Sequence, residues 1–228
     1  MAWDILITHI KGLAQVRDNT PVVLSGAAMA ELPILENAYL AISDGKIADY
    51  GEMQSLSNLL AEQVIDAAGR FVFPSFVDSH THLVFAASRE EEFVMKIKGV
   101  SYAEIAAKGG GILNSAQKLQ QMSEAELYER SVSRAFEIIK SGTGAVEIKS
   151  GYGLTVADEL KMLRVARRIG RETPLEVKTT FLGAHAVPQS HSKEKYIQLV
   201  IEEMIPAVAE EKLADYIDVF CEQGFFSP

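Results

Sequence analysis

The feature that most limits how this chain can fold is a regular alternation of apolar strands with amphipathic helices. We expect strands at residues 71–77, 145–149, 175–182 and 216–221. We expect helices from Ser123 to about Lys140, from Thr155 to Gly170 and from Lys193 to Glu211, the last with a kink at Pro206. Strands that alternate with helices in this order predict parallel βαβ units.

Two of the expected helices carry the sequence signature of a capped N-terminus. Ser123 is followed three residues later by Glu126, and Thr155 is followed in the same way by Asp158. A hydroxyl at the first position can accept a hydrogen bond from a free backbone N–H of the first turn. These pairs therefore mark where both helices begin.

The second expected strand distinguishes an open sheet from a closed barrel. Apolar and charged side chains alternate in Val146-Glu147-Ile148-Lys149, whereas a parallel sheet covered by helices on both faces is apolar on both. We expect Val146 and Ile148 to face the helices, and Glu147 and Lys149 to face a barrel interior that is polar near its active end. The predicted fold class is α/β, a TIM-like (β/α)8 barrel of which the first four βα strands are present.

The N-terminal residues predict a separate small β module. Short strands are expected at 4–8, 38–42 and 46–50, and Asp44-Gly45 is a favoured two-residue hairpin turn. We place this partial module at residues 1–66 and the first half of the barrel at residues 67–228. Complete barrels run to about 250 residues, so we expect the chain to be part of a protein roughly twice as long.

Composition excludes several classes of function. Acidic residues outnumber Lys and Arg by 31 to 22, which disfavours nucleic acid because phosphate binding needs clustered positive charge. Cys221 is the only cysteine, so no internal disulfide requires an oxidising compartment. No apolar run is long enough for a signal peptide or a membrane span. We therefore expect a cytoplasmic protein that binds a small molecule and neither nucleic acid nor a membrane.

His80 and His82 are the first candidates for chemistry, because they follow directly on the expected strand 71–77. Alternate side chains of an extended segment project to the same side, about 6 to 7 Å apart, so both imidazoles can reach one cation. Two imidazoles suit zinc or iron better than magnesium or calcium. The alternative is a pair of solvated histidines, but with five histidines in the chain such a pair at this position favours a metal site.

The segment from Phe73 to His82, preceded by the β module, resembles the first-strand motif of the amidohydrolase superfamily, with Ser75 where that motif usually has Gly. Further blocks resemble the imidazolonepropionase family within it. These blocks are residues 82–86, 88–90, 109–112, 147–154, 159–164, 180–188 and 218–222. The resemblance covers residues 35–228 and implies a barrel of the metal-dependent hydrolase type with an N-terminal β-sandwich.

The resemblance implies hydrolysis of 4-imidazolone-5-propanoate to N-formimino-L-glutamate, a step of histidine degradation. It implies one zinc or iron ion that activates a water molecule, with His80 and His82 as two of its ligands. The family draws a further His, an Asp and a carboxylate acid/base from later strands. We therefore expect the chain by itself to bind metal weakly and to be inactive.

The resemblance also assigns substrate-binding residues. Arg89 can hold the propanoate carboxylate by paired hydrogen bonds, although an Arg beside several Glu residues is otherwise more often a surface ion-pair partner. Tyr152 and His185, which follow the second and third strands, are expected to contact and orient the substrate, and His185 is the catalytic candidate. Without the resemblance, both would be interpreted as structural. Tyr102 is a weaker substrate candidate, since it also fits the first turn of a capped helix.

Other residues suggest functions that we do not favour. Gly109-Gly110-Gly111 lacks the Lys-Ser/Thr of a phosphate-binding loop, so we expect a mobile loop over the site. Glu147 and Lys149 are expected to form an interior ion pair rather than an acid–base couple. Cys221 is expected to be inert core. The fourth strand ends in Cys221-Glu222 without a lysine that could be carbamylated, which favours a single metal.

Two alternatives remain open at this stage. The chain could belong to another amidohydrolase, such as a heterocycle deaminase, which would not need Arg89 for an anionic substrate. It could instead be a non-catalytic metal-binding half-barrel. A homodimer is also possible.

Overall fold

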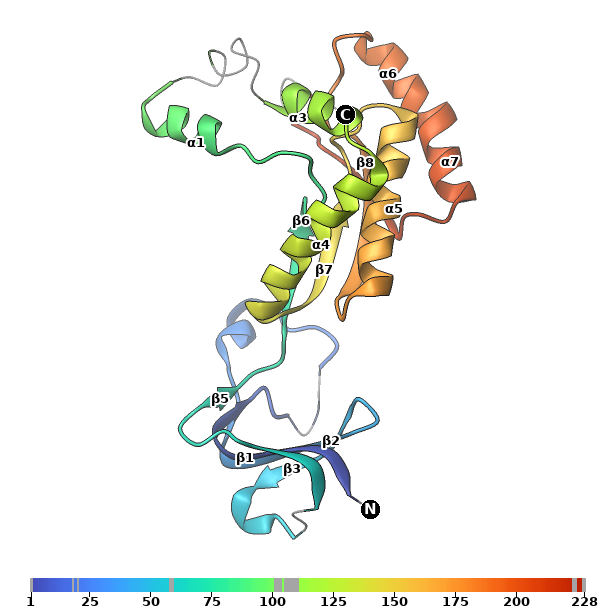
Figure 1. Cartoon of the computed structure of the whole chain (residues 1–228). Helices are drawn as coiled ribbons and strands as arrows, with labels where there is room; N and C mark the ends of the chain where they lie inside the picture. The colour runs from blue at the N-terminus through green and yellow to red at the C-terminus, as the bar shows by residue number, and fades with distance from the viewer. Residues whose placement is uncertain are drawn as a thin grey trace. The chain divides into compact units, whose positions relative to one another are not determined.

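A computed structural model describes residues 2–17, 19, 21–57, 60–100, 104, 111–222 and 225–226 of the chain (Figure 1). The chain divides into two compact units, residues 1–74 and 75–228. Each unit has its own sheet and its own core, so each is described by itself. No helix in the described ranges is both long and apolar enough to cross a membrane.

The first unit is built on one five-stranded sheet. Its strands are β1 (Trp3–Ala14), β2 (Ile34–Ser43), β3 (Lys46–Glu52), β4 (Ala61–Asp66) and β5 (Phe71–Val72). The order is β3-β2-β1-β4, with β5 also paired to β1. Two short 3-10 helices, η1 (Gly26–Ala30) and η2 (Met53–Ser55), lie in the connections. The expected strands 4–8, 38–42 and 46–50 lie within β1, β2 and β3.

The hairpin between β2 and β3 turns at the expected dipeptide. Asp44 and Gly45 both have positive φ, 52° and 69°, as a type I′ turn requires. The parallel strand β4, which pairs with β1, was not predicted, because its sequence Ala61-Glu62-Gln63-Val64-Ile65-Asp66 is only partly apolar.

The expected strand 71–77 is wrong as a single strand. Phe71–Val72 forms β5 and pairs with β1 in the first unit, whereas β6 (Phe76–Thr81) begins the second unit. Pro74 lies between them and has no N–H with which to continue a ladder. The division between the units therefore falls after Pro74 rather than after residue 66, and His80 lies inside β6 rather than beyond a strand.

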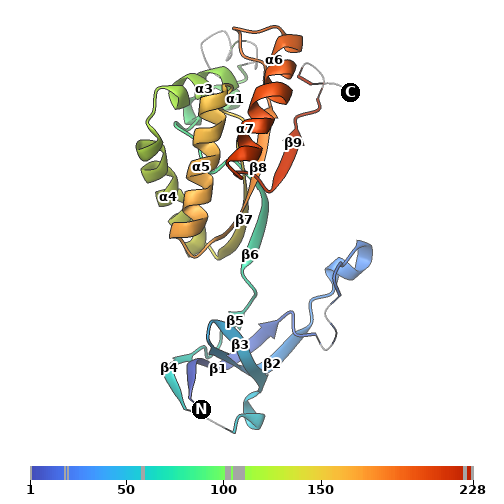
Figure 2. The same cartoon turned by 90° about the vertical axis from the view of Figure 1, so that its right-hand side faces the viewer.

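The second unit contains four parallel strands in the order β6-β7-β8-β9. The other three strands are β7 (Thr143–Lys149), β8 (Glu176–Ala184) and β9 (Tyr216–Val219). The described helices are α1 (Glu90–Ile97), α3 (Ile112–Gln120), α4 (Glu124–Lys140), α5 (Val156–Glu172), α6 (Lys193–Leu199), the π-helical turn η3 (Val200–Met204) and α7 (Ile205–Glu210). Helices α4 and α5 and the turn η3 pack against β7 and β8, on one side of the sheet (Figure 2), as right-handed crossovers between sequential parallel strands require.

The expected helices are present, with small differences at their ends. The hydroxyls of Ser123 and Thr155 accept from the N–H groups of Glu126 and Asp158, as predicted. Helix α5 continues two residues beyond Gly170. Gly170 therefore lies inside the helix, at a position where an added Cβ atom would come within 3.0 Å of Val177. The third helix is interrupted by η3, which precedes Pro206 in the first turn of α7; proline has no N–H to donate to a carbonyl of the preceding turn.

The alternation along β7 has the predicted effect. Val146 and Ile148 are buried in a core that includes Leu127 of α4 and Val165 of α5. Glu147 and Lys149, which form an ion pair, lie on the other side of the sheet. The second unit is therefore a curled parallel half-barrel in a mixed α/β fold, with helices on its outer face.

Candidate functional site

The two candidate metal ligands lie at the carboxyl end of β6. His80 is the exposed penultimate residue of β6, and the partly buried His82 follows the strand directly. Their ring centroids are 5.8 Å apart, a separation at which both imidazoles can reach a shared cation. The extended backbone over residues 80–82 thus gives the proximity that the sequence predicted.

His82 is held in its neutral form. Burial, followed by the nearby His185 and His80, lowers the pKa of His82 from 6.5 to about 4. Its Nδ1 atom is buried and has no hydrogen-bond partner within the described residues. A buried nitrogen of this kind normally has a partner, and a neutral imidazole is the form that binds metals. The same residues contain no group of three or more His, Cys, Asp or Glu side chains arranged to hold a metal.

The rings of His82, Tyr152 and His185, from three strand ends, lie close together. Tyr152 follows β7 and His185 follows β8 directly. The ring centroid of His82 is 5.0 Å from that of Tyr152 and 5.2 Å from that of His185, and Tyr152 and His185 are 5.3 Å apart. The His82 and His185 rings are stacked, with an angle of 8° between their planes. The carboxyl ends of parallel strands share one edge of a barrel sheet, which is why residues so distant in sequence come together.

His185 is oriented by the loop after β7. Its Nδ1 atom lies 2.9 Å from the carbonyl oxygen of Gly151. Burial lowers the pKa of His185, although the hydrogen bond to Gly151 acts in the opposite direction. The ring of Phe220 stands edge-on to the imidazole at 5.6 Å. The ring is therefore fixed by backbone on one side and by an aromatic side chain on another.

Arg89 lies at the N-terminus of α1, and its partner there is Glu92. The Arg89 Nε atom is 2.7 Å from a carboxylate oxygen of Glu92, whose other oxygen accepts from the Gly111 N–H at 2.8 Å. Burial raises the pKa of Glu92, but these hydrogen bonds and the charge of Arg89 outweigh it, so that the pKa lies below its usual value. Arg89 is thus both an ion-pair partner and a residue held in place at the site.

A cavity of about 380 Å³ connects three of the predicted residues. It is lined by His82, Phe85, Ala87, Ser88, Arg89, Glu90, Phe93, Ser115 and Tyr152. Two phenylalanines give it apolar walls, and the guanidinium, imidazole and phenol supply polar groups. This combination is typical of sites for small organic molecules.

An ionic network lies on the face of the sheet opposite the helices. The Lys149 Nζ atom is 2.7 Å from Glu147 and 3.0 Å from Asp218 of β9, and Thr180 donates a hydrogen bond to Glu147. The predicted interior ion pair is confirmed, and Asp218 is a third member that the sequence did not reveal. These mutual contacts hold the three charges in structural pairs, which argues against Glu147 and Lys149 acting as an acid–base couple.

Tyr102 and the dipeptide Gly109-Gly110 lie outside the described residues. Cys221 was expected as inert core at the end of a strand, but β9 ends at Val219 and Cys221 is exposed. The pairing of β8 and β9 shifts between Phe181 and Ala184, so the chain leaves the regular ladder before it reaches the cysteine.

Sequence reasoning missed the residues that hold the site together. Glu92 and Glu159 are both buried acids whose oxygens accept backbone N–H groups near the site. Arg134 of α4 donates to the carbonyls of Leu83 and Phe85 in the loop after β6. A helical acid or arginine with this role has no distinctive local pattern, so only the tertiary structure identifies it.

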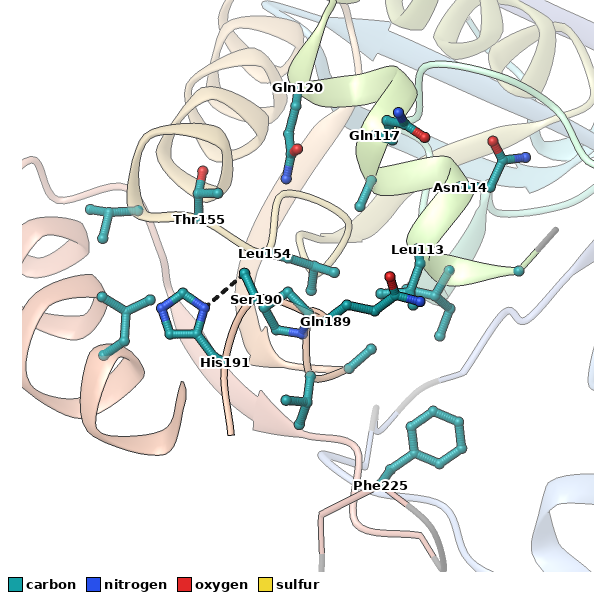
Figure 3. A pocket seen from close by; sticks show the side chains of 18 residues that line it. Leu113, Asn114, Gln117, Gln120, Leu154, Thr155, Gln189, Ser190, His191 and Phe225 are labelled. Atoms are coloured by element: carbon teal, nitrogen blue, oxygen red, sulfur yellow. Dashed lines mark hydrogen bonds between the residues drawn. The ribbon is translucent and has the colours of Figure 1, made fainter. Parts of the chain in front are cut away.

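A larger cavity lies elsewhere in the second unit. It has a volume of about 1040 Å³ and is lined by residues of α3, of α5 and its N-cap, and of the segment after β8 (Figure 3). His191, hydrogen-bonded to Ser190 at 2.9 Å, is the one ionisable side chain among its described lining residues. None of the predicted site residues that the structure describes lines it, so chemistry rather than size locates the candidate site in the smaller cavity.

Comparison with known proteins finds relatives over nearly the whole chain. No family model matches it. The chain is 54% identical to an imidazolonepropionase of Flavobacterium johnsoniae over 224 residues, covering 97% of this chain and 54% of that protein. It is 53% identical to an imidazolonepropionase of Christiangramia forsetii over 225 residues, covering 98% and 55%. The chain therefore spans about half the length of the curated relatives it matches.

Solved structures support the fold. The chain is similar to a triazine hydrolase from Arthrobacter aurescens, with a TM-score of 0.58 and 15% identity over 98% of this chain and 48% of that one. It is also similar to a 5-methylcytosine deaminase from Klebsiella pneumoniae, with a TM-score of 0.56 and 15% identity, over 95% of this chain and 51% of that one. A zinc complex of an atrazine chlorohydrolase from Arthrobacter aurescens has a TM-score of 0.54 and 14% identity, over 94% of this chain and 46% of that one. At these identities the comparison establishes the fold alone.

Proposed function

We propose that this chain, more than half identical to imidazolonepropionases over nearly its whole length, is the substrate-recognising part of such an enzyme. In the complete protein it would take part in the hydrolysis of the ring C–N bond of 4-imidazolone-5-propanoate to N-formimino-L-glutamate in histidine degradation. The observation that carries this proposal is the cavity shared by His82, Arg89 and Tyr152, with His185 stacked on His82.

The chemistry of the cavity fits an anionic heterocycle. A guanidinium can form paired hydrogen bonds with the propanoate carboxylate, and Arg89 is the guanidinium that lines this cavity. Tyr152 and His185 would contact and orient the imidazolone ring. Tyr102 stays a weaker substrate-binding candidate on the resemblance alone.

His80 and His82 fit a zinc or iron ion as two of its ligands. The buried, unpaired Nδ1 atom and the low pKa of His82 are what a neutral metal-binding imidazole would show. The structural relative solved with zinc supports a metal in this fold. A metal at such a site supplies Lewis-acid activation of water. Because two imidazoles are fewer than a catalytic site needs, we propose that the remaining ligands come from residues outside this sequence.

We extend the fold in the same way. The relatives are about twice as long as the chain, and a closed barrel of this kind has eight parallel strands. We propose that the second unit, residues 75–228, supplies the first four strands of the barrel and that the first unit, residues 1–74, supplies part of a β-sandwich. The 228-residue chain alone is then inactive.

The proposal is tested with a hybrid enzyme in which residues 1–228 replace the matching part of the Flavobacterium johnsoniae relative. In this hybrid, Arg89→Met is expected to raise KM for 4-imidazolone-5-propanoate at least about tenfold, because a charge-assisted pair with the carboxylate is lost. Arg130→Met, which alters an arginine on α4 that is outside the cavity, is the matched control and should leave KM within about twofold.

Two outcomes would count against the proposal. An unchanged KM in the Arg89→Met hybrid would mean that this residue binds no anionic group of the substrate. Release of ammonia from a purine or pyrimidine, without turnover of imidazolone propanoate, would point to a heterocycle deaminase instead.

A further inference from the structure

Glu159 is a buried acid directly beneath the loop after β7, residues 150–154. It lies in the first turn of α5 and is 0% exposed. One carboxylate oxygen accepts from the N–H groups of Gly153 at 2.7 Å and Leu154 at 3.0 Å, and the other accepts from Gly151 at 2.9 Å. Burial raises the pKa of Glu159, and hydrogen bonds from Ser150 and these N–H groups oppose that rise. A buried acid is costly unless its oxygens are paired, and here both are paired to one loop.

The loop would not keep its shape without such a partner. Gly151 has φ of 108° and Leu154 has φ of 57°, and the left-handed region costs a residue with a side chain about 1 to 2 kcal/mol. At Gly151 an added Cβ atom would come within 2.7 Å of the His185 Nδ1 atom and 2.9 Å of the Leu182 carbonyl oxygen. The N–H groups of Gly151 and Gly153 would be buried and unpaired without Glu159, at a cost comparable to a lost hydrogen bond for each.

A second residue holds the outer side of the same loop. Gln120 of α3, at the rim of the larger cavity (Figure 3), donates from Nε2 to the Gly153 carbonyl oxygen at 2.9 Å. Glu159 therefore binds the N–H groups of the loop, and Gln120 binds one of its carbonyl groups. Side chains from two helices therefore hold the loop, in addition to its bonds with β8 through Ser150.

The loop in turn determines the state of two site residues. Tyr152 is carried by it, and the Gly151 carbonyl oxygen lies 2.9 Å from the Nδ1 atom of His185. A carbonyl oxygen only accepts hydrogen bonds, so Nδ1 must carry the proton. In the neutral imidazole the lone pair is then on Nε2, which makes Nε2 an acceptor. A ring N–H of a heterocyclic substrate is a donor that suits it.

We infer that Glu159 is a positioning residue of the site: its carboxylate holds loop 150–154 so that Tyr152 is placed and His185 is fixed as the Nδ1–H tautomer. The suitability of that tautomer for an imidazolone ring N–H rests on the proposed function. The loop geometry and the tautomer do not.

The test is nuclear magnetic resonance on the ¹⁵N-labelled 228-residue chain. In the unsubstituted chain, the ring nitrogens of His185 are expected to show the Nδ1–H tautomer, and the amides of Gly151, Gly153 and Leu154 to exchange at least about 100-fold more slowly than in an unfolded peptide. In Glu159→Gln, one acceptor oxygen becomes an NH2 donor that cannot pair with a loop N–H group, so at least one of these amides loses protection and His185 becomes a mixture of tautomers.

Two controls separate positioning from general loss of stability. Glu172→Gln makes the same change near the other end of α5, where the side chain pairs with Arg168. Ile169→Ala removes a fully buried side chain from the core under the same helix. Both should keep the tautomer and the protected amides. If Glu159→Gln does not fold, the unsubstituted chain alone decides: a His185 ring protonated at Nε2, or unprotected amides at 151, 153 and 154, would overturn the inference.

The functional consequence is measured in the hybrid enzyme. Glu159→Gln should raise KM for 4-imidazolone-5-propanoate at least about tenfold, and Ile169→Ala should leave it within about twofold. Equal KM values would overturn a role in recognition. The spectra need no turnover, so they remain decisive for Glu159 even if the substrate is a different heterocycle.

Discussion

Two recognition candidates of the site, Arg89 and His185, are each held in place by a second group. Arg89 is held by Glu92, which also accepts the Gly111 N–H. His185 is held by the Gly151 carbonyl, which depends on Glu159. Both Glu92 and Glu159 are buried acids that accept backbone N–H groups; Glu92 also contacts Arg89 directly, whereas Glu159 acts on His185 through the loop. Their removal should therefore alter recognition more than their distance from a substrate would suggest.

Glu92→Gln tests the first of these pairs. The amide keeps the shape of the side chain but loses the charge that holds the Arg89 guanidinium, and a charge-assisted hydrogen bond contributes about 1.5 to 3 kcal/mol. We expect KM for imidazolone propanoate in the hybrid enzyme to rise about tenfold with kcat little changed. Glu126→Gln, which makes the same change in an acid of α4 that pairs with Arg130 and does not line the cavity, is the control. Similar KM values for the two variants would show that Glu92 does not position Arg89.

Asp215 provides a test of pH dependence away from the candidate metal ligands. Burial raises its pKa, but hydrogen bonds from the Thr179 N–H at 2.8 Å and from Arg167 outweigh this, so the pKa lies below 3.8 in the folded chain. A depressed carboxyl pKa stabilises the fold above about pH 4, and this stabilisation is lost as the pH falls through the folded-state value.

We expect Asp215→Asn to lower the free energy of unfolding by about 1 kcal/mol at pH 7. Urea unfolding at pH 7, 5 and 3 measures this effect. The difference between the variant and the unsubstituted chain should shrink at pH 3, and a difference that is constant with pH would contradict the assignment.

At the scale of helices and strands, the loops that carry the site are fastened by the helices that follow them. Arg134 of α4 donates to the Leu83 and Phe85 carbonyls at 3.0 and 2.8 Å and stacks on the Phe85 ring at 3.8 Å. It thus fixes the segment between the metal-ligand candidates and Arg89. Burial, followed by the nearby charge of Arg130, lowers the pKa of Arg134, and the charge of Glu137 opposes this.

Arg134→Met is expected to lower the free energy of unfolding of the second unit by about 2 to 4 kcal/mol, because two buried carbonyl groups lose their donors. Urea denaturation followed by circular dichroism measures this. Arg130→Met removes a longer, 3.3 Å bond to the Ala86 carbonyl and an exposed ion pair with Glu126, so it should cost under about 1 kcal/mol. Equal losses for the two variants would argue against a special role for Arg134.

The elements that the sequence predicted best were those with strong local signals. The caps at Ser123 and Thr155, the Asp44-Gly45 turn and the alternation in β7 each depend on neighbours a few residues away. The division of 71–77 into β5 and β6 and the parallel strand β4 depend on pairing with β1, more than 50 residues earlier. Such distant pairing leaves little trace in a local pattern, so these features could not be predicted.

The site shows the same contrast. His80 and His82 could be predicted from their spacing in a strand, whereas Arg89, Tyr152 and His185 were assigned from a family resemblance. Their convergence on one cavity follows from the parallel order of β6, β7 and β8. Glu92, Arg134 and Glu159 could not be predicted, since each acts through contacts that only the folded chain creates.

At the scale of the whole molecule, the half-barrel has open edges. Strands β6 and β9 are the end strands of the described four-stranded sheet. Apolar side chains are exposed along both, with Val77 at 73% and Ile217 at 59%. Exposed end strands with apolar side chains favour association with other strands.

We therefore expect the 228-residue chain to self-associate as its concentration rises, measured by sedimentation velocity. Val77→Lys combined with Ile217→Lys should shift the sample toward monomer. Ile201→Lys, which changes an apolar residue of similar exposure on η3, should not. A chain that remains monomeric at every concentration would show that the edges are protected.

We propose that this chain is the substrate-recognising half of an imidazolonepropionase. The most direct measurement is the loss of 4-imidazolone-5-propanoate absorbance with the hybrid enzyme, compared with the 228-residue chain alone at equal concentration and with zinc supplied. We predict steady hydrolysis to N-formimino-L-glutamate by the hybrid and none by the chain alone. A folded, zinc-loaded hybrid that leaves the substrate intact, or turnover by the chain alone, would contradict the account.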